Sequence, residues 1–263
     1  AVRAEADVDL ADTVYSAADT RIESQGGFAI RSGAELAAGS SVDISAQRID
    51  IDGSLISGLN NQGINQADGL LSLSASGHIN NRGVVHSGLS LLSAVSGIDN
   101  SGDIAARSLV LETVGAFNNR NGELLVEDRA LLRVAGVDNR GGTLAIGDDS
   151  IIAARSDIDN RGGLILVEGA AAEIASGTTI LNTNGDVLHT GEGQLLIAAE
   201  LGVDNSAGAM ASRGQLNVSA QTLNNNDGEL LADSLLINGN AVSNGHGAME
   251  ANVATVIAEQ LLN

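Results

Sequence analysis

The chain has 263 residues, and its 33 acidic and 13 basic residues give it a formal net charge of −20 at pH 7. It contains no Cys, Pro or Trp, and all of its basic residues are Arg. These absences exclude disulfides, thiolate metal sites, Schiff-base lysines and phosphate-loop lysines. The acidic charge and the scarcity of aromatic side chains also argue against nucleic acid as a partner. No stretch approaches the ~18 apolar residues of a membrane-spanning helix, so we expect no membrane insertion.

Residues 1–56 show strand-like alternation but only a weak repeat. The segments Val42-Asp43-Ile44-Ser45 and Ile49-Asp50-Ile51-Asp52 alternate with a period of two, which is typical of β-strands. The segment 22–27 resembles 158–163, and this alignment places Ser24 where the later segment has Asn160. We therefore expect 1–56 to form degenerate coils of the same fold as the regular repeats of 57–263.

From residue 57 onward a short pattern recurs about every 20 residues. An apolar residue is followed two positions later by an Asn, and a Gly comes two or three positions after that Asn. The Asn residues are Asn61, Asn81, Asn100, Asn119, Asn139, Asn160, Asn182, Asn205, Asn225, Asn244 and Asn263. The Gly residues are Gly63, Gly83, Gly102, Gly122, Gly142, Gly163, Gly185, Gly208, Gly228 and Gly247.

Short runs of Val, Ile and Leu with a period of two lie between these corners, for example 124–126 and 131–134. Such runs indicate strands, and no helical stripe of period 3.6 accompanies them. The sequence therefore predicts an all-β fold, a parallel β-helix of about 13 coils with roughly 20 residues per coil. We expect right-handed winding, as in other parallel crossovers, and a rod on the order of 60 Å long.

The recurring Asn and Gly have a structural interpretation. Asn side chains at the same corner of successive coils can bond to the turn and to one another, which would form an amide ladder. We expect the following Gly to supply a positive φ. On this interpretation Asn61, Asn81, Asn100, Asn119, Asn139, Asn160, Asn182, Asn205, Asn225 and Asn244 are structural residues.

The sequence predicts no catalytic residue, no metal site and no cofactor. The four His residues, His78, His86, His189 and His246, fall at different places in the coil, and we expect them to be exposed. Calcium-binding β-rolls contain glycine-rich nonapeptides, which this sequence lacks. We therefore expect the acidic residues to lie on a solvated outer face.

Three arginines could form a surface stripe. Arg120, Arg140 and Arg161 each follow the corner Asn in consecutive coils. In one interpretation Asp138 and Asp159 neutralise them in a mixed-charge ladder. In the other they form a binding stripe for anionic glycans, which requires these carboxylates to point elsewhere.

The unit apolar-Asx-Asn-x-(x)-Gly resembles the filamentous haemagglutinin repeat of two-partner secretion exoproteins, a family of adhesins and contact-dependent inhibition proteins. The strongest matches are 98–102, 137–142 and 158–163. The resemblance implies a β-helical shaft that an outer-membrane β-barrel transporter exports to the bacterial cell surface. It also implies a host-cell or bacterial receptor or glycan as a partner. The Asn-Pro motifs of the family's secretion domain are absent from this sequence, which contains no Pro.

The leading functional hypothesis is a non-enzymatic spacer that also contributes to adhesion. A receptor-binding region of a contact-dependent inhibition protein is the alternative within the family, and only residues 1–60 offer the non-repeating patch that it needs. A polysaccharide-cleaving β-helix enzyme is disfavoured by the lack of Lys and Trp. A DNA-mimicking β-helix would need an apolar residue every five positions, which the chain does not show.

Overall fold

The computed structural model describes residues 1–59 and 68–263, and every regular element within them is a β-strand. The strands pair in parallel and wind into a β-solenoid of about 13 turns with roughly 20 residues per turn. The all-β parallel solenoid predicted from the sequence is therefore confirmed. In the described ranges no helix is long and apolar enough to span a membrane. The chain forms two compact units, Ala1–Glu127 and Asp128–Asn263.

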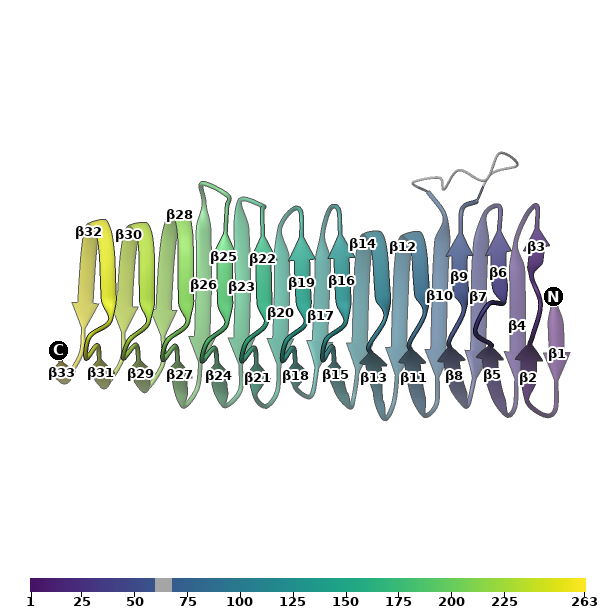
Figure 1. Cartoon of the computed structure of the whole chain (residues 1–263), viewed down its shortest axis with the longest axis horizontal. Coiled ribbons are helices and arrows are strands. Elements are labelled where there is room, and N and C mark those ends of the chain that lie inside the picture. Colours follow the sequence, from purple (N-terminus) through teal and green to yellow (C-terminus); the bar gives the residue numbers. More distant parts are fainter. Residues whose placement is uncertain (60–67) are drawn as a thin grey trace. The chain divides into compact units, whose positions relative to one another are not determined.

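Each turn of unit 1, Ala1–Glu127, contributes strands to three faces, and Figure 1 shows the strands of each face side by side. The middle face consists of β2 (Val8–Leu10), β5 (Gly27–Ile30), β8 (Arg48–Ile51), β11 (His78–Asn81), β13 (Gly97–Asn100) and β15 (Ala116–Asn118). The strands before and after it are β1 (Val2–Ala4), β3 (Val14–Ser16), β4 (Thr20–Ser24), β6 (Glu35–Ala38), β7 (Ser41–Ala46), β9 (Ser54–Ser57), β10 (Leu70–Ala75), β12 (Val84–Ala94), β14 (Asp103–Thr113) and β16 (Glu123–Val126).

Unit 2, Asp128–Asn263, repeats the same plan. Its middle face consists of β18 (Val137–Asp138), β21 (Ile158–Asp159), β24 (Thr179–Leu181), β27 (Gly202–Asp204), β29 (Thr222–Asn224), β31 (Ala241–Ser243) and β33 (Gln260–Leu262). The flanking strands are β17 (Ala130–Val134), β19 (Thr143–Ile146), β20 (Ser150–Ala154), β22 (Leu164–Val167), β23 (Ala171–Ser176), β25 (Asp186–His189), β26 (Gln194–Ala199), β28 (Ala209–Ser219), β30 (Glu229–Asn238) and β32 (Ala248–Ile257).

The core of unit 1 is a set of in-register aliphatic and aromatic columns. On the middle face Phe28 pairs with Ile49, and the column continues through Ile79 and Ile98 to Phe117. Phe28 and Phe117 are fully buried, at 0% exposure. Burial of each such side chain is worth roughly 1.5–3 kcal/mol, and because the strands pair in register, every turn extends the core of its neighbour.

The strand register corrects the assignment of the first turns. Asn81 pairs with Ile51 of the turn before it, and Ile51 pairs with Ile30 of the turn before that. The corner position that holds Asn in the later turns therefore holds Ile in these two. Ser24 pairs with Ala4 at the end of β4, before the middle face, so its placement at the Asn corner was wrong. Asn61 and Gly63 lie outside the described residues.

Candidate functional site

Corner asparagines in unit 1 bond directly from one turn to the next. Asn81 Nδ2 donates to Asn100 Oδ1 at 2.8 Å, and Asn100 Nδ2 donates to Asn119 Oδ1 at 2.7 Å. Each amide also donates to a backbone carbonyl of the following turn, that of Asp103 or Glu123, at 3.0 Å. The three side chains are buried. The Nδ2 groups of Asn81 and Asn100 therefore each have two acceptors, as buried amides require.

The corner asparagines of unit 2 form a longer ladder of the same kind. The Nδ2 atoms of Asn139, Asn160, Asn182, Asn205 and Asn225 each donate to the Oδ1 of the next corner asparagine at 2.7 Å. Asn244 donates to Asn263 Oδ1 at 3.1 Å. Side-chain amides thus run parallel to the backbone hydrogen bonds of the middle face, and they fix how the turns stack.

At most of the described corners the glycine that follows the Asn is required by close approach, and it does not supply the positive φ. A Cβ on Gly163 would lie 2.1 Å from the Asn139 carbonyl oxygen. The positive φ belongs instead to the residue before that glycine, for example Gly162 at 64° and Asn184 at 54°. The expectation that the corner glycine provides the left-handed residue was therefore wrong. Where the Gly comes only two positions after the Asn, as at Asn81, the corner is one residue shorter and has no residue with a positive φ.

Arginines beside the corners of unit 2 are paired with aspartates. Arg140 donates to both carboxylate oxygens of Asp138, at 2.9 and 2.8 Å, and lies 3.4 Å from Asp159. Arg161 donates to both oxygens of Asp159, at 2.9 and 2.6 Å, and this carboxylate raises the pKa of the Arg161 guanidinium. These carboxylates do not point away, so the arrangement is a mixed-charge ladder. In unit 1 the Arg120 backbone N–H donates to Asn118 Oδ1 at 3.2 Å.

One histidine departs from the expected exposure. His189 is buried at 2% exposure in β25, where it pairs with Val167 of β22 and Ser212 of β28. Its Nε2 lies 2.7 Å from the Gly169 carbonyl oxygen and its Nδ1 lies 2.8 Å from Ser212 Oγ. Since a carbonyl oxygen only accepts, Nε2 carries a proton and donates it to Gly169, and in the neutral imidazole Nδ1 accepts from the Ser212 hydroxyl. His78, His86 and His246 are exposed.

A hollow of about 480 Å³ opens on the outer side of the middle face of unit 1. Small residues form its floor, because Gly27 and Ala29 occupy the outward positions of β5. The equivalent outward positions of the neighbouring turns carry Asp9 on one side and Asp50 on the other. The hollow was not predicted from the sequence, because it depends on the register between turns.

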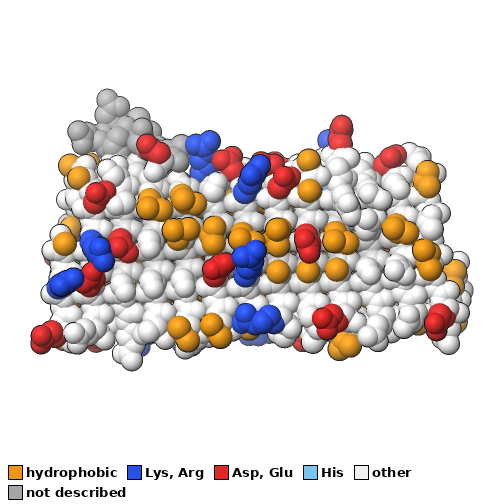
Figure 2. All heavy atoms as spheres, turned by 180° about the vertical axis from the view of Figure 1, so that it is seen from behind, with side chains coloured by type: hydrophobic (Ala, Val, Ile, Leu, Met, Phe, Trp, Pro, Cys, Tyr) orange, Lys and Arg blue, Asp and Glu red, His pale blue; other side chains and the backbone are white. Residues whose placement is uncertain are grey.

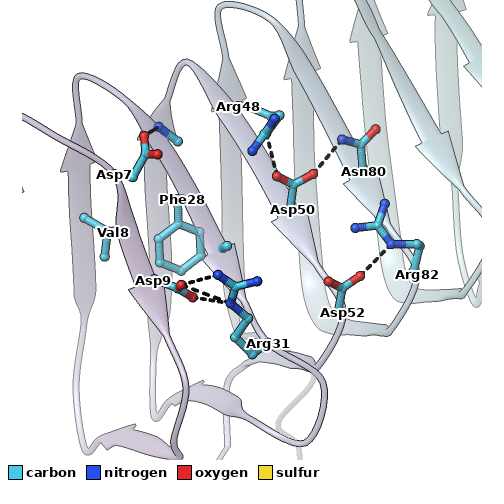
Figure 3. A pocket seen from close by; sticks show the side chains of 12 residues that line it. Asp7, Val8, Asp9, Phe28, Arg31, Arg48, Asp50, Asp52, Asn80 and Arg82 are labelled. Carbon is cyan, nitrogen blue, oxygen red and sulfur yellow. Dashed lines mark hydrogen bonds and ion pairs between the residues drawn. The ribbon is translucent and has the colours of Figure 1, made fainter.

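Ion pairs surround the hollow. Arg31 holds the Asp9 carboxylate with two nitrogens, and this hydrogen bonding lowers the pKa of Asp9. Arg48 Nε lies 2.6 Å from Asp50 Oδ2, and the other oxygen of Asp50 accepts from Asn80 at 2.7 Å. Figure 3 shows these side chains extending from successive strands toward one another.

The third pair lies beside the other two. Arg82 Nε donates to Asp52 Oδ1 at 2.6 Å, and this bond raises the pKa of the Arg82 guanidinium. The lining thus carries four aspartates and three arginines, a formal net charge of −1. Among the described residues, no three His, Cys, Asp or Glu side chains come together as a metal site.

Comparisons with family models, with curated proteins and with solved structures gave no match for this chain. The resemblance to the filamentous haemagglutinin repeat therefore stays a prediction from the sequence.

Proposed function

We propose that this chain is a β-helical shaft segment of a secreted or surface-displayed bacterial exoprotein, where it acts as a spacer and contributes to adhesion, without enzymatic activity. The observation that carries the proposal is the repetition of one turn in both units, with the same three faces and the same hydrogen-bonded Asn corner. Such a repeat extends a structure in one direction at ~4.8 Å per turn.

The proposed export route and partners rest on the repeat motif. An exoprotein of this type would pass through an outer-membrane β-barrel transporter of the two-partner secretion type and then meet a host-cell or bacterial receptor or glycan. Figure 2 shows Arg side chains interspersed with acidic ones on this face of the molecule. Together with the net charge of −20, this distribution favours a partner other than nucleic acid.

A whole-turn deletion tests the spacer function. Leu223 pairs with Val242, so removal of residues 223–241 joins two equivalent positions of consecutive turns. We expect this variant to fold and its longest dimension in small-angle X-ray scattering to fall by ~4.8 Å. Removal of residues 223–232 alone is the control, and it should unfold the C-terminal turns because the register is broken. A whole-turn deletion that unfolds, or that leaves the length unchanged, would contradict the shaft proposal.

Attachment is tested by titrating the fluorescently labelled chain onto intact epithelial cells and onto sister bacteria. Saturable binding supports an adhesive surface, and the variant with Arg120, Arg140 and Arg161 all changed to Ser tests whether the arginines contribute. Absence of binding by a sample with a β-rich circular dichroism spectrum would restrict the function to that of a spacer.

The hollow in unit 1 favours a second candidate, a receptor-binding region of a contact-dependent inhibition protein. It is lined by residues between Asp7 and Arg82, where the repeat is least regular, whereas a pure spacer needs no such feature.

A further inference from the structure

We infer that one outer face of unit 2 docks an amphipathic α-helix that carries basic side chains on its apolar side. Such a docking surface goes beyond the spacer and adhesion functions proposed above, and its argument does not depend on them. The face, here called the aliphatic face, is the outer side of β17, β20, β23, β26 and residues 215–219 of β28, which pair side by side in parallel.

An outward row of mostly apolar side chains crosses the strands of the aliphatic face. Its members, in register from turn to turn, are Leu131, Ile151, Glu173, Leu196 and Asn217. They point outward because they alternate with buried residues along their strands. Ile151 is 40% exposed, and the other four are half-buried. The next row along the strands contains Ala153, Ala175 and Ala198. Figure 2 shows hydrophobic side chains in rows across the strands, with single charged side chains among them.

Glu173 is an unpaired carboxylate within this row. It is the one charged residue of β20, β23 and β26, all of which the structure describes in full. Its side chain forms no ion pair or hydrogen bond with the described residues, whereas Asp159 of the same unit is held by Arg161. Ile151 and Leu196 exclude part of the water around it. A cation that a partner places over Glu173 therefore interacts with it more strongly than with a fully solvated carboxylate.

Asn217 is the second polar member of the row that lacks a partner. Its Oδ1 atom is covered by protein atoms and accepts no hydrogen bond from the described residues. A covered acceptor without a donor costs free energy, and a donor supplied by a partner would recover that cost once the side chain turns toward it. Glu173 and Asn217 thus both favour a partner that presents N–H donors on an otherwise apolar side.

The spacing of the row fits a helix that lies across the strands. Neighbouring members lie ~4.8 Å apart, so two turns separate Glu173 from Asn217 by ~9.6 Å. Positions i and i+7 of an α-helix share one side and lie ~10.5 Å apart along its axis. An extended chain instead repeats on one side every ~6.8 Å, which does not match. The four steps from Leu131 to Asn217 span ~19 Å, the length of about 13 helical residues.

A second copy of this chain does not fit the aliphatic face in the same way. Every regular element in the described residues is a strand, so a second copy supplies no such helix from them. The net charge of −20 also makes two copies repel each other. The unpaired carboxylate of Glu173 calls for the opposite charge, and we therefore assign the occupant to a separate, basic helix.

The test titrates the whole chain against two fluorescently labelled helical peptides of about 18 residues and follows their anisotropy. The first peptide has Leu on one side and, on that same side, two Lys at positions i and i+7. The second has the same composition and charge, but both Lys lie on the opposite side. We expect the first peptide to bind at least about tenfold more tightly. Equal affinities would mean unspecific attraction to an acidic protein and would overturn the inference.

A charge-neutralising variant tests the role of Glu173. Glu173→Gln should weaken binding of the first peptide by about tenfold, a loss of roughly 1.4 kcal/mol in binding free energy. The matched control is Glu229→Gln, which removes an exposed carboxylate from β30 on another face of the same unit, and it should bind as the unaltered chain does. Equal losses in the two variants would show that only the overall charge matters, and this outcome would also overturn the inference.

Leu196→Gln tests the apolar contribution and should weaken binding by about fivefold or more. Its control is Leu188→Gln, which changes a half-buried outward side chain of β25 on another face and should leave binding unchanged. Circular dichroism verifies that both variants stay β-rich, and the comparison of the two peptides needs no variant at all. Sedimentation of the chain alone tests the other occupant. A dimer that Leu196→Gln dissociates would make the aliphatic face an interface between copies and overturn the inference.

Discussion

The Asn182 side chain bridges three turns of unit 2, because its Nδ2 atom donates to Asn205 Oδ1 at 2.7 Å while its Oδ1 atom accepts from Asn160 Nδ2 at 2.7 Å. The same Nδ2 atom also reaches the carbonyl oxygens of Gly185 at 2.9 Å and Ala209 at 3.0 Å. One fully buried amide therefore joins its own corner to the corners before and after it.

Replacement of Asn182 by Ala should lower the free energy of unfolding by about 1–3 kcal/mol, because the neighbouring amide and carbonyl groups lose their partner in a buried place. Chemical denaturation followed by circular dichroism measures the change. The control is Asn252→Ala, which removes an exposed amide that bonds Asp233, and it should alter stability by less than about 0.5 kcal/mol. Equal effects of the two substitutions would show that the ladder contributes nothing specific.

Gly163 and Gly162 are adjacent but should respond differently to substitution. A Cβ on Gly163 would clash with the Asn139 carbonyl oxygen, whereas nothing lies within 4 Å of one on Gly162. Gly163→Ala should cost about 1–3 kcal/mol or more, because the two turns must move apart. Gly162→Asn should be tolerated, since Asn121 and Asn184 adopt the same positive φ at equivalent corners. Thermal melts of the two variants provide the comparison, and a more damaging Gly162→Asn would contradict this account.

Asp9 should titrate below its ordinary range because Arg31 holds its carboxylate. A lowered pKa in the folded state means that the pair contributes to stability at pH values above the ordinary carboxyl pKa. That contribution is lost as the pH falls through the lower, folded-state pKa. A carboxylate ¹³C NMR titration measures this pKa directly. Arg31→Gln should raise it toward the ordinary value, whereas Arg120→Gln, which removes an arginine of the same unit that does not contribute to the Asp9 shift, should not move it. An unchanged Asp9 pKa in Arg31→Gln would refute the assigned cause.

The sequence predicted the solenoid because the corner pattern and the strand period are both local signals. Ser24 was assigned to the corner wrongly because the repeat pattern was followed through the polar corner residue alone. In Ile49-Asp50-Ile51, as in Ile79-Asn80-Asn81, an apolar residue is followed by a polar residue and then by the corner residue, which here is Ile in place of Asn. This similarity could have been used to predict the corner at Ile51. The spacing from Ile51 to Asn81 is also longer than one regular turn, so a fixed period of about 20 residues could not find it.

The hollow could not be predicted for a related reason. Its floor and rim come from residues whose distance along the chain varies from turn to turn, and their alignment is fixed only by the hydrogen-bonded register of β2, β5 and β8. In contrast, the pairing of Arg140 and Arg161 with aspartates is local, and it was one of the two alternatives that the sequence left open.

The buried pair His189 and Ser212 replaces apolar packing in a column that is otherwise aliphatic. Val167 lies on one side of the pair and Ala232 on the other, in register. His189→Ala should destabilise unit 2 by about 2–4 kcal/mol, because it leaves a cavity and removes the partner of Ser212 Oγ and of the Gly169 carbonyl.

The double variant His189→Val with Ser212→Ala should recover part of that loss, since it extends the aliphatic column through both turns and removes the His–Ser pair together. The Gly169 carbonyl and the Gly214 N–H still lose their side-chain partners in this variant. The single variants His189→Val and Ser212→Ala and the double variant form a cycle whose coupling energy, from denaturation curves, should reach about 0.5–3 kcal/mol. Additive effects would mean that the two side chains act independently despite their 2.8 Å contact. The recovery would also show that the histidine is not needed for folding.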